Sequence, residues 1–221
     1  MPTVEPTMGL LAEVPPALLA WALALAATLL LVIAGRRLTL LCFALQYPLF
    51  AALALLDLYR PLALVMTGLG LAVAAIFYVT AAYRQPHPEG QQHRSLAAML
   101  RASHVGDMGL GFRLVAAVFA AFVVYGLARA YPLPNAPHGT GFVYYQLIVV
   151  GLLTALTSVD PLRRGYGLLT LLRGFQGIYL LLEQSFLVLS LWSFVEIITA
   201  LAIAYFGQLW LDSAYTEREA E

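Results

Sequence analysis

One carboxyl group stands in the middle of an apolar stretch near the end of the chain. Glu196 is flanked by Val195 and Ile197 and belongs to a run with few ionisable side chains. A carboxylate at the centre of a membrane span costs about 2.5–3.5 kcal/mol on insertion scales, and such residues commonly mark ion or proton paths. We therefore predict that Glu196 binds and releases a proton inside a membrane, with Thr199, three residues on, placed to hold a water molecule.

Further polar side chains in apolar segments extend this predicted proton path. Gln176 and Glu183 are seven residues apart and therefore share a helix face, and Arg173 lies three residues before Gln176. Polar side chains in a span normally face the bundle interior and find partners there. We expect Arg173 to pair with an acid from the neighbouring helix or from another subunit. Gln46 is a second intramembrane glutamine and is assigned to the same path.

Two alternatives for these residues stay open. Gln46 and Gln176 are also suited to hydrogen bonds that hold membrane helices together, each worth about 1 kcal/mol. Glu183 stands where its helix should reach the membrane surface, so an ordinary exposed acid in a turn is the other interpretation.

The composition defines an integral membrane protein. The 221 residues are 62% hydrophobic and 11% charged, too apolar for one soluble core. Net charge is zero and no basic tract is present, which argues against a nucleic-acid partner and leaves the lipid bilayer as the surroundings.

Cys42 is the single cysteine, so no disulfide framework is possible within the chain. The first 16 residues lack the positively charged start of a cleaved signal peptide.

Apolar windows of about 20 residues, the length that crosses the bilayer, predict an all-α fold with seven transmembrane helices. They cover residues 17–34, 38–56, 62–83, 110–130, 142–158, 165–182 and 188–211. We expect the whole chain, 1–221, to form a single membrane domain, with a tight turn before the last helix.

Arginine distribution predicts the orientation. Eight arginines lie on one predicted side, at positions 36, 37, 84, 94, 101, 163, 164 and 218, and two lie on the other, at 60 and 129. The positive-inside rule then places the N-terminus outside and the C-terminus in the cytoplasm. The loop 84–109 and the tail 212–221 are accordingly predicted to be cytoplasmic.

An internal repeat is also indicated. Segments 36–47 and 163–177 each begin with an arginine pair and continue through an apolar helix to a glutamine, if a slip of three residues is allowed. Four spans separate the two, so the copies share one orientation. The predicted layout is a parallel 3+1+3 arrangement, with units 17–83 and 142–211 and the connector helix 110–130.

No catalytic chemistry is expected within the chain. No Ser/His/Asp arrangement, glycine-rich phosphate loop or histidine pair at helical spacing is present. The spacing of His87, His93 and His104 matches no metal motif. We therefore predict no catalytic, cofactor-binding or metal-binding residue.

Several of these segments resemble known membrane subunits. The arginine pair at 163–164, the polar residue about thirteen positions later, the tight turn and the helix at 195–206 resemble subunit K of bacterial respiratory complex I. Over nearly its full length the chain resembles membrane component E of hydrogenase-4 and formate hydrogenlyase type complexes. Its length, its seven predicted spans, its segment Arg36-Arg37-Leu38-Thr39 to Gln46 and the helix end at 78–84 carry that resemblance.

The resemblance implies a small, non-catalytic subunit of an oxidoreductase or ion-translocating complex in a bacterial or archaeal cytoplasmic membrane. Its partners would be other membrane subunits, including antiporter-like ones, and it would bind no cofactor. Glu196 would correspond to the acid of the second helix in a proton (or Na⁺) path. Where the family has a glutamate in the preceding helix, this chain has Gln176, which cannot change its charge. A second acid would then be Glu183 or one from a partner.

Two other classes of function remain. One is a purely structural scaffold subunit of a membrane complex. The other is a free-standing carrier, because the 3+1+3 layout is also that of the SWEET sugar carriers. Those carry Pro-Gln motifs in both halves, whereas this chain has the order Gln46-Tyr47-Pro48 once.

Overall fold

The computed structural model describes residues 15–33, 35–57, 60–83, 109–136, 140–183 and 185–219. These residues form seven helices and no strand. The helices are α2 (Pro16–Val32), α3 (Arg36–Asp57), α4 (Arg60–Tyr83), α6 (Leu110–Ala130), α7 (Phe142–Thr157), α8 (Pro161–Leu182) and α9 (Phe186–Glu219).

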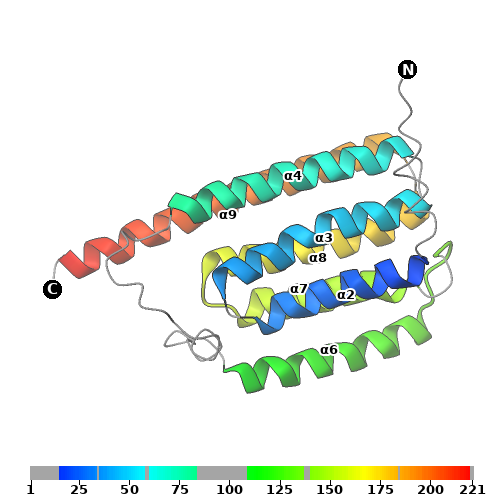
Figure 1. Ribbon diagram of the computed structural model, residues 1–221, viewed down its shortest axis with the longest axis horizontal. Coiled ribbons are helices and arrows are strands. Elements are labelled where there is room, and N and C mark those ends of the chain that lie inside the picture. Colours follow the sequence, from blue (N-terminus) through cyan, green and yellow to red (C-terminus); the bar gives the residue numbers. More distant parts are fainter. Residues whose placement is uncertain are drawn as a thin grey trace.

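The helices run side by side in two layers (Figure 1). Helices α2, α3 and α4 form one layer and contact α7, α8 and α9 of the other, each with its counterpart. Helix α6 lies at one edge of the bundle, against α7 and α2. Helix α2 begins at one end of the bundle, and α9 projects beyond the opposite end (Figure 1).

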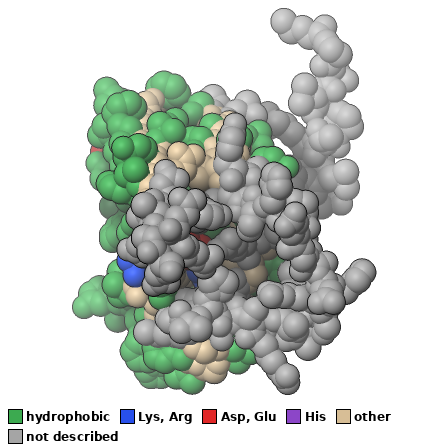
Figure 2. Space-filling model, turned by 90° about the vertical axis from the view of Figure 1, so that its left-hand side faces the viewer, with side chains coloured by type: hydrophobic (Ala, Val, Ile, Leu, Met, Phe, Trp, Pro, Cys, Tyr) green, Lys and Arg blue, Asp and Glu red, His purple; other side chains and the backbone are tan. Residues whose placement is uncertain are grey.

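Three of the described helices are long and apolar enough to cross a membrane. These segments are Leu38–Leu55 of α3, the whole of α6, and Phe186–Leu209 of α9. Large apolar side chains cover the outer faces of α6 and α9, and the described side chains visible from the projecting end are mainly hydrophobic (Figure 2). Apolar surface of this extent needs lipid or a partner to cover it. The chain is therefore a membrane protein.

The helix positions agree with the predicted spans to within a few residues, with two corrections. Helix α8 begins at Pro161, four residues before the predicted start. The Asp160 carboxylate accepts a hydrogen bond from Leu162 N, and proline is favourable in the first turn. Helix α9 continues past the predicted end of the last span at residue 211 and remains helical to Glu219. The predicted N-terminal segment and nearly all of the loop 84–109 lie outside the described residues.

Arginine side chains at the start of α8 connect it to the ends of other helices. Arg163 Nη2 donates hydrogen bonds to the carbonyl oxygens of Leu31, at 2.7 Å, and Leu30, at 3.3 Å. These carbonyls belong to the last turn of α2, where backbone acceptors lack partners within the helix and the helix dipole favours a cation. Arg164 Nε donates to the Ser158 carbonyl just before α8.

Glycines allow α7 and α8 to approach each other closely. A β-carbon added at Gly151 would lie 2.5 Å from Leu171 N and 2.7 Å from Gly167 O, both backbone atoms of α8. Small residues at helix contacts are the usual means by which membrane helices pack tightly, because lipid provides little hydrophobic drive between helices. This tight contact fixes α8, and thereby the polar side chains that α8 carries.

Replacing Gly151 by alanine is expected to lower stability by about 1–3 kcal/mol, since the new methyl group would push two backbones apart. Gly126→Ala is the matched control, because a β-carbon on Gly126 of α6 would meet nothing within 4 Å. Thermal unfolding of both variants in mild detergent, followed by circular dichroism, checks this. Equal melting temperatures for the two variants would contradict the tight α7–α8 contact.

Candidate functional site

Three helices bring one tyrosine, one arginine and one glutamate together inside the bundle. Arg173 Nη2 on α8 donates to Glu196 Oε1 on α9 at 2.8 Å, and the Tyr47 hydroxyl on α3 donates to the same oxygen at 3.0 Å. The exposed fractions are 1% for Arg173, 3% for Glu196 and 6% for Tyr47. The acid from a neighbouring helix that the sequence predicted as a partner for Arg173 is thus Glu196.

Aromatic rings support the arginine from its other side. The Arg173 guanidinium carbon lies 3.3 Å from the centre of the Tyr47 ring and 5.6 Å from that of Phe43. A cation over an aromatic face is attracted by the ring's quadrupole, more strongly when both are desolvated. Tyr47 therefore contacts both members of the ion pair: its ring contacts Arg173 and its hydroxyl binds Glu196.

The pair lies at mid-depth in the helices. Glu196 is ten residues after the start of α9, which at 1.5 Å per residue is about 15 Å, half of the hydrocarbon thickness. Arg173 is similarly twelve residues into the 22 of α8. A carboxylate at this depth is tolerated because Arg173 compensates its charge and two donors satisfy one of its oxygens.

Two glutamines lie close to the pair. Gln46 on α3 is fully buried and accepts a hydrogen bond at 3.1 Å from the Thr170 hydroxyl on α8. Gln176 on α8 is 3% exposed, and its Nε2 has no hydrogen-bond partner among the described residues. Both glutamines therefore face the bundle interior, within one helical turn of Arg173 or Tyr47.

Buried apolar clusters lie on both sides of the Arg173–Glu196 ion pair along α8. Toward the start of α8, the rings of Phe43, Phe77 and Tyr166 pack together, with centroids 4.9–5.7 Å apart. Toward the turn between α8 and α9, Leu180 and Leu189 belong to a second buried cluster. The ion pair is thus enclosed between two apolar layers along α8.

The remaining predicted path residues lie away from the pair. Glu183 is exposed at the C-cap of α8, which agrees with the alternative of an ordinary acid in a turn. The Thr199 hydroxyl donates to Val195 O of its own helix at 2.7 Å and does not contact the pair. The structure therefore brings together Arg173 and Glu196, with Gln46 and Gln176 nearby, and excludes Glu183 and Thr199 from direct contact.

Tyr47 and Thr170 were missed by the sequence reasoning. Tyr47 sits in an apolar helix next to Gln46, and a tyrosine there gives no signal that separates a buried hydroxyl from an interfacial one. Thr170 offered a weak signal, because it lies three residues before Arg173 on the same helix face.

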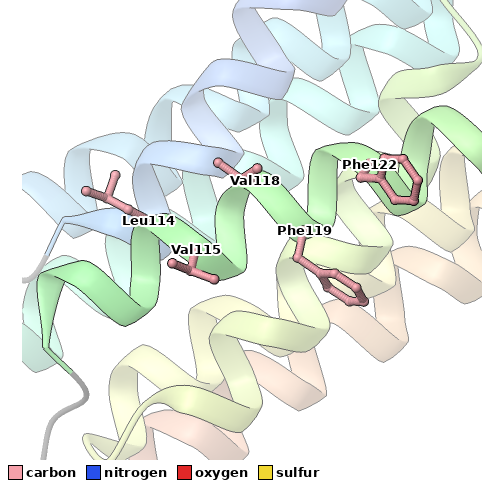
Figure 3. Close-up of a pocket in the computed structure, with 5 residues that line it drawn as sticks. All are labelled: Leu114, Val115, Val118, Phe119 and Phe122. Atoms are coloured by element: carbon pink, nitrogen blue, oxygen red, sulfur yellow. The ribbon is translucent and has the colours of Figure 1, made fainter.

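A shallow groove on α6 is separate from this site. It is lined by Leu114, Val115, Val118, Phe119 and Phe122, all of them exposed, and these side chains lie along the helix surface (Figure 3). Because its lining is entirely apolar, the groove offers no group for catalysis or for polar recognition. It is suited to lipid chains or to another membrane helix.

No family model, curated protein or solved structure matches this chain. Among the described residues no group of three His, Cys, Asp or Glu side chains comes together, and His87, His93 and His104 lie outside them. The function must therefore be argued from the buried pair itself.

Removing one partner of the pair should be more costly than removing both. Arg173→Met or Glu196→Met alone is expected to lower stability by about 3–5 kcal/mol, because a buried charge is left without its counter-charge. Arg173→Met should be the milder change, since Glu196 can become neutral by binding a proton whereas an arginine cannot lose one. The double variant should lose clearly less than the sum. Unfolding of the wild type, the two single variants and the double variant in a denaturing-detergent titration measures the coupling free energy between the two side chains. If the two single effects add up to the double effect within about 0.5 kcal/mol, the ion pair contributes no coupling energy to stability.

Proposed function

We propose that this chain is a small, non-catalytic membrane-arm subunit of a complex I-like or group 4 hydrogenase-like complex, in which Glu196 forms part of a proton (or Na⁺) path. The observation that carries the proposal is a carboxylate at mid-depth, 3% exposed and held by Arg173 and Tyr47. An ionisable side chain at this depth that faces the bundle interior and pairs with an opposite charge is typical of proton relays.

The same proposal includes seven membrane spans. Helices α2, α4, α7 and α8 run alongside the three long apolar helices, and α2, α7 and Val65–Thr80 of α4 are shorter apolar segments (Figure 1). Helix α8 carries three arginines, of which two are buried: Arg163 caps α2 and Arg173 meets Glu196, whereas Arg164 is exposed. A bundle of parallel and antiparallel helices would then cross the bilayer as a unit.

Helix positions support the parallel 3+1+3 repeat. Helices α7, α8 and α9 begin 126, 125 and 126 residues after α2, α3 and α4, and each contacts its counterpart. A nearly constant offset over three helices is expected from a duplicated unit. At the offset of 125 residues between α3 and α8, Gln46 aligns with Leu171 and not with Gln176, so the helix positions support the repeat but the two glutamines do not. We retain the N-out, C-in orientation in a bacterial or archaeal cytoplasmic membrane from the arginine distribution.

In the proposed mechanism Glu196 alternates between two states. As a carboxylate it accepts hydrogen bonds from Arg173 and Tyr47. When a proton binds to the carboxylate, the attraction to Arg173 falls and the arginine, which keeps its own proton, needs another anion or dipole. A charge on an adjacent antiporter-like subunit could supply it, which would couple proton binding here to events in the neighbour.

A second acid for the relay is proposed to come from a partner. Gln176 occupies the place where the resembled family has a glutamate, and it cannot change charge. Glu183 is seven residues further along α8, about 10 Å in helical rise, and exposed at the helix end. The chain therefore supplies one titratable group to the path, which fits a companion of the pumping subunits better than a pump.

A scaffold role is the second candidate, and one observation favours it. Glu196 already has two donors and lies between two apolar clusters, so the pair would also serve to fix α9 against α8 and α3.

Glu196→Gln separates these two candidates. Glutamine retains an oxygen that can accept from Tyr47 and Arg173 but cannot carry a proton in and out. We expect the variant complex to assemble and to lose most of its proton translocation, measured by a pH-sensitive dye in inverted membrane vesicles. Glu183→Gln, an exposed acid at the end of the preceding helix, is the control and should keep normal translocation. Normal translocation by an assembled Glu196→Gln complex would leave only the scaffold role.

Purification of the tagged chain in mild detergent, with mass spectrometry of what accompanies it, tests the partners. Recovery with antiporter-like membrane subunits and iron-sulfur or nickel-iron proteins is the expected result. Recovery of the chain alone, as a stable monomer or homo-oligomer, would contradict the subunit role and favour a free-standing carrier.

A further inference from the structure

Two buried hydrogen-bond donors, on Gln176 and Ser193, lie three residues along their helices from the ion pair, toward the turn between α8 and α9. Gln176 is 3% exposed and its Nε2 has no hydrogen-bond partner among the described residues, and the same holds for the buried Oγ of Ser193. Nη1 of Arg173 is a third such donor. Buried polar groups are normally hydrogen-bonded, so these three donors require acceptors beyond those that the described residues supply.

Helix register places these donors opposite one another. Helices α8 and α9 are antiparallel neighbours, and the bond between Arg173 and Glu196 fixes their levels. Gln176 follows Arg173 by three residues and Ser193 precedes Glu196 by three, so both are displaced by about 4.5 Å along the helix axes in the same direction. On α9, the partly buried Ser193 lies at spacings of four and three from the buried Leu189 and Glu196, so it is on the inner face of the helix.

We propose that Gln176 Nε2, Ser193 Oγ and Arg173 Nη1 form a water-binding site that hydrates Glu196 from the side of the α8–α9 turn. A buried water typically makes about three hydrogen bonds to otherwise unsatisfied groups, and its oxygen accepts at most two of them, so one water can join two of these donors and point a proton to an acceptor such as a carboxylate. The inference deepens the proposed function, on which it rests, by naming the side from which water, and with it the proton, reaches Glu196.

One further unpartnered buried donor, Gln46 Nε2, lies on α3 toward the other side of the pair, and the two sides of Glu196 differ along α9 itself. On the other side, one turn along α9, Ala200 is fully buried in the cluster that contains Phe43, Phe77 and Tyr166. On the turn side, Leu180 and Leu189, with exposed fractions of 1% and 0%, form the apolar layer between the water site and the exposed Glu183. Water entry from this side would require these two leucines to separate.

Cysteine reactivity tests the proposal in the full chain, in sealed membrane vesicles. Cys42 is the only cysteine, so a Cys42→Ala background allows single thiols to be introduced. Ser193→Cys is the test, and Ala200→Cys is the matched control, because both replace a small residue on the inner face of α9 on opposite sides of Glu196. The probe is a charged methanethiosulfonate reagent, which does not enter lipid and reacts with thiolates in water.

We expect the thiol of Ser193→Cys to react at least roughly tenfold faster than that of Ala200→Cys, since reactivity follows water access and thiolate formation. The reaction should occur from the face at which the α8–α9 turn lies, and Gln176→Leu should slow it. Equal rates at the two positions, including no reaction at either, would overturn the proposal, as would labelling from the opposite face.

The outcome is separable from that of the proton-translocation experiment. Faster reaction of the Ser193→Cys thiol together with normal translocation by Glu196→Gln would support the water site and remove the proton role. Loss of translocation with equal thiol rates would support the proton role and overturn the water site.

Discussion

The desolvation of Glu196 and Arg173 is the constraint on which the rest of the bundle depends. Each charge alone would be costly at mid-depth in a membrane, and the pair is tolerated only if its geometry is held. Three helices supply that geometry: α8 and α9 carry the charges and α3 adds Tyr47, whose hydroxyl and ring contact both. The register of α3, α8 and α9 is therefore fixed by a polar contact, whereas apolar packing alone would tolerate slippage.

Close helix packing is what brings these polar groups within reach of each other. Gly151 and Gly167 let the backbones of α7 and α8 nearly touch, and a β-carbon on Gly70 of α4 would overlap the Tyr47 ring. Gly70 thus leaves room for Tyr47 to turn its ring onto Arg173. Since lipid provides little drive for helices to associate, small residues and a few buried polar contacts must supply the specificity.

The sequence predicted the helices well because apolar windows report directly on burial in lipid, and all seven described helices overlap the predicted spans. The sequence also predicted that Glu196 and Arg173 belong to a buried polar site, since charged residues stand out in apolar windows. Helical spacing alone predicted the other path residues less well. Glu183 shares a helix face with Gln176 yet lies at the exposed end of α8, and the Thr199 hydroxyl is bonded to a carbonyl of its own helix. Tyr47 was missed because its role depends on a contact 149 residues away in sequence, which no local pattern encodes.

The choice of arginine as the counter-ion limits what this chain can do alone. A lysine in this position could give up its proton and let both charges vanish together, but arginine remains charged, so protonation of Glu196 leaves one net positive charge in the bundle. The described residues around the pair offer it aromatic faces and amides and no second carboxylate. Under the proposed mechanism, the positive charge left on Arg173 whenever Glu196 is neutral needs an anion or a dipole that the described residues around the pair do not supply, and a partner subunit is the proposed source.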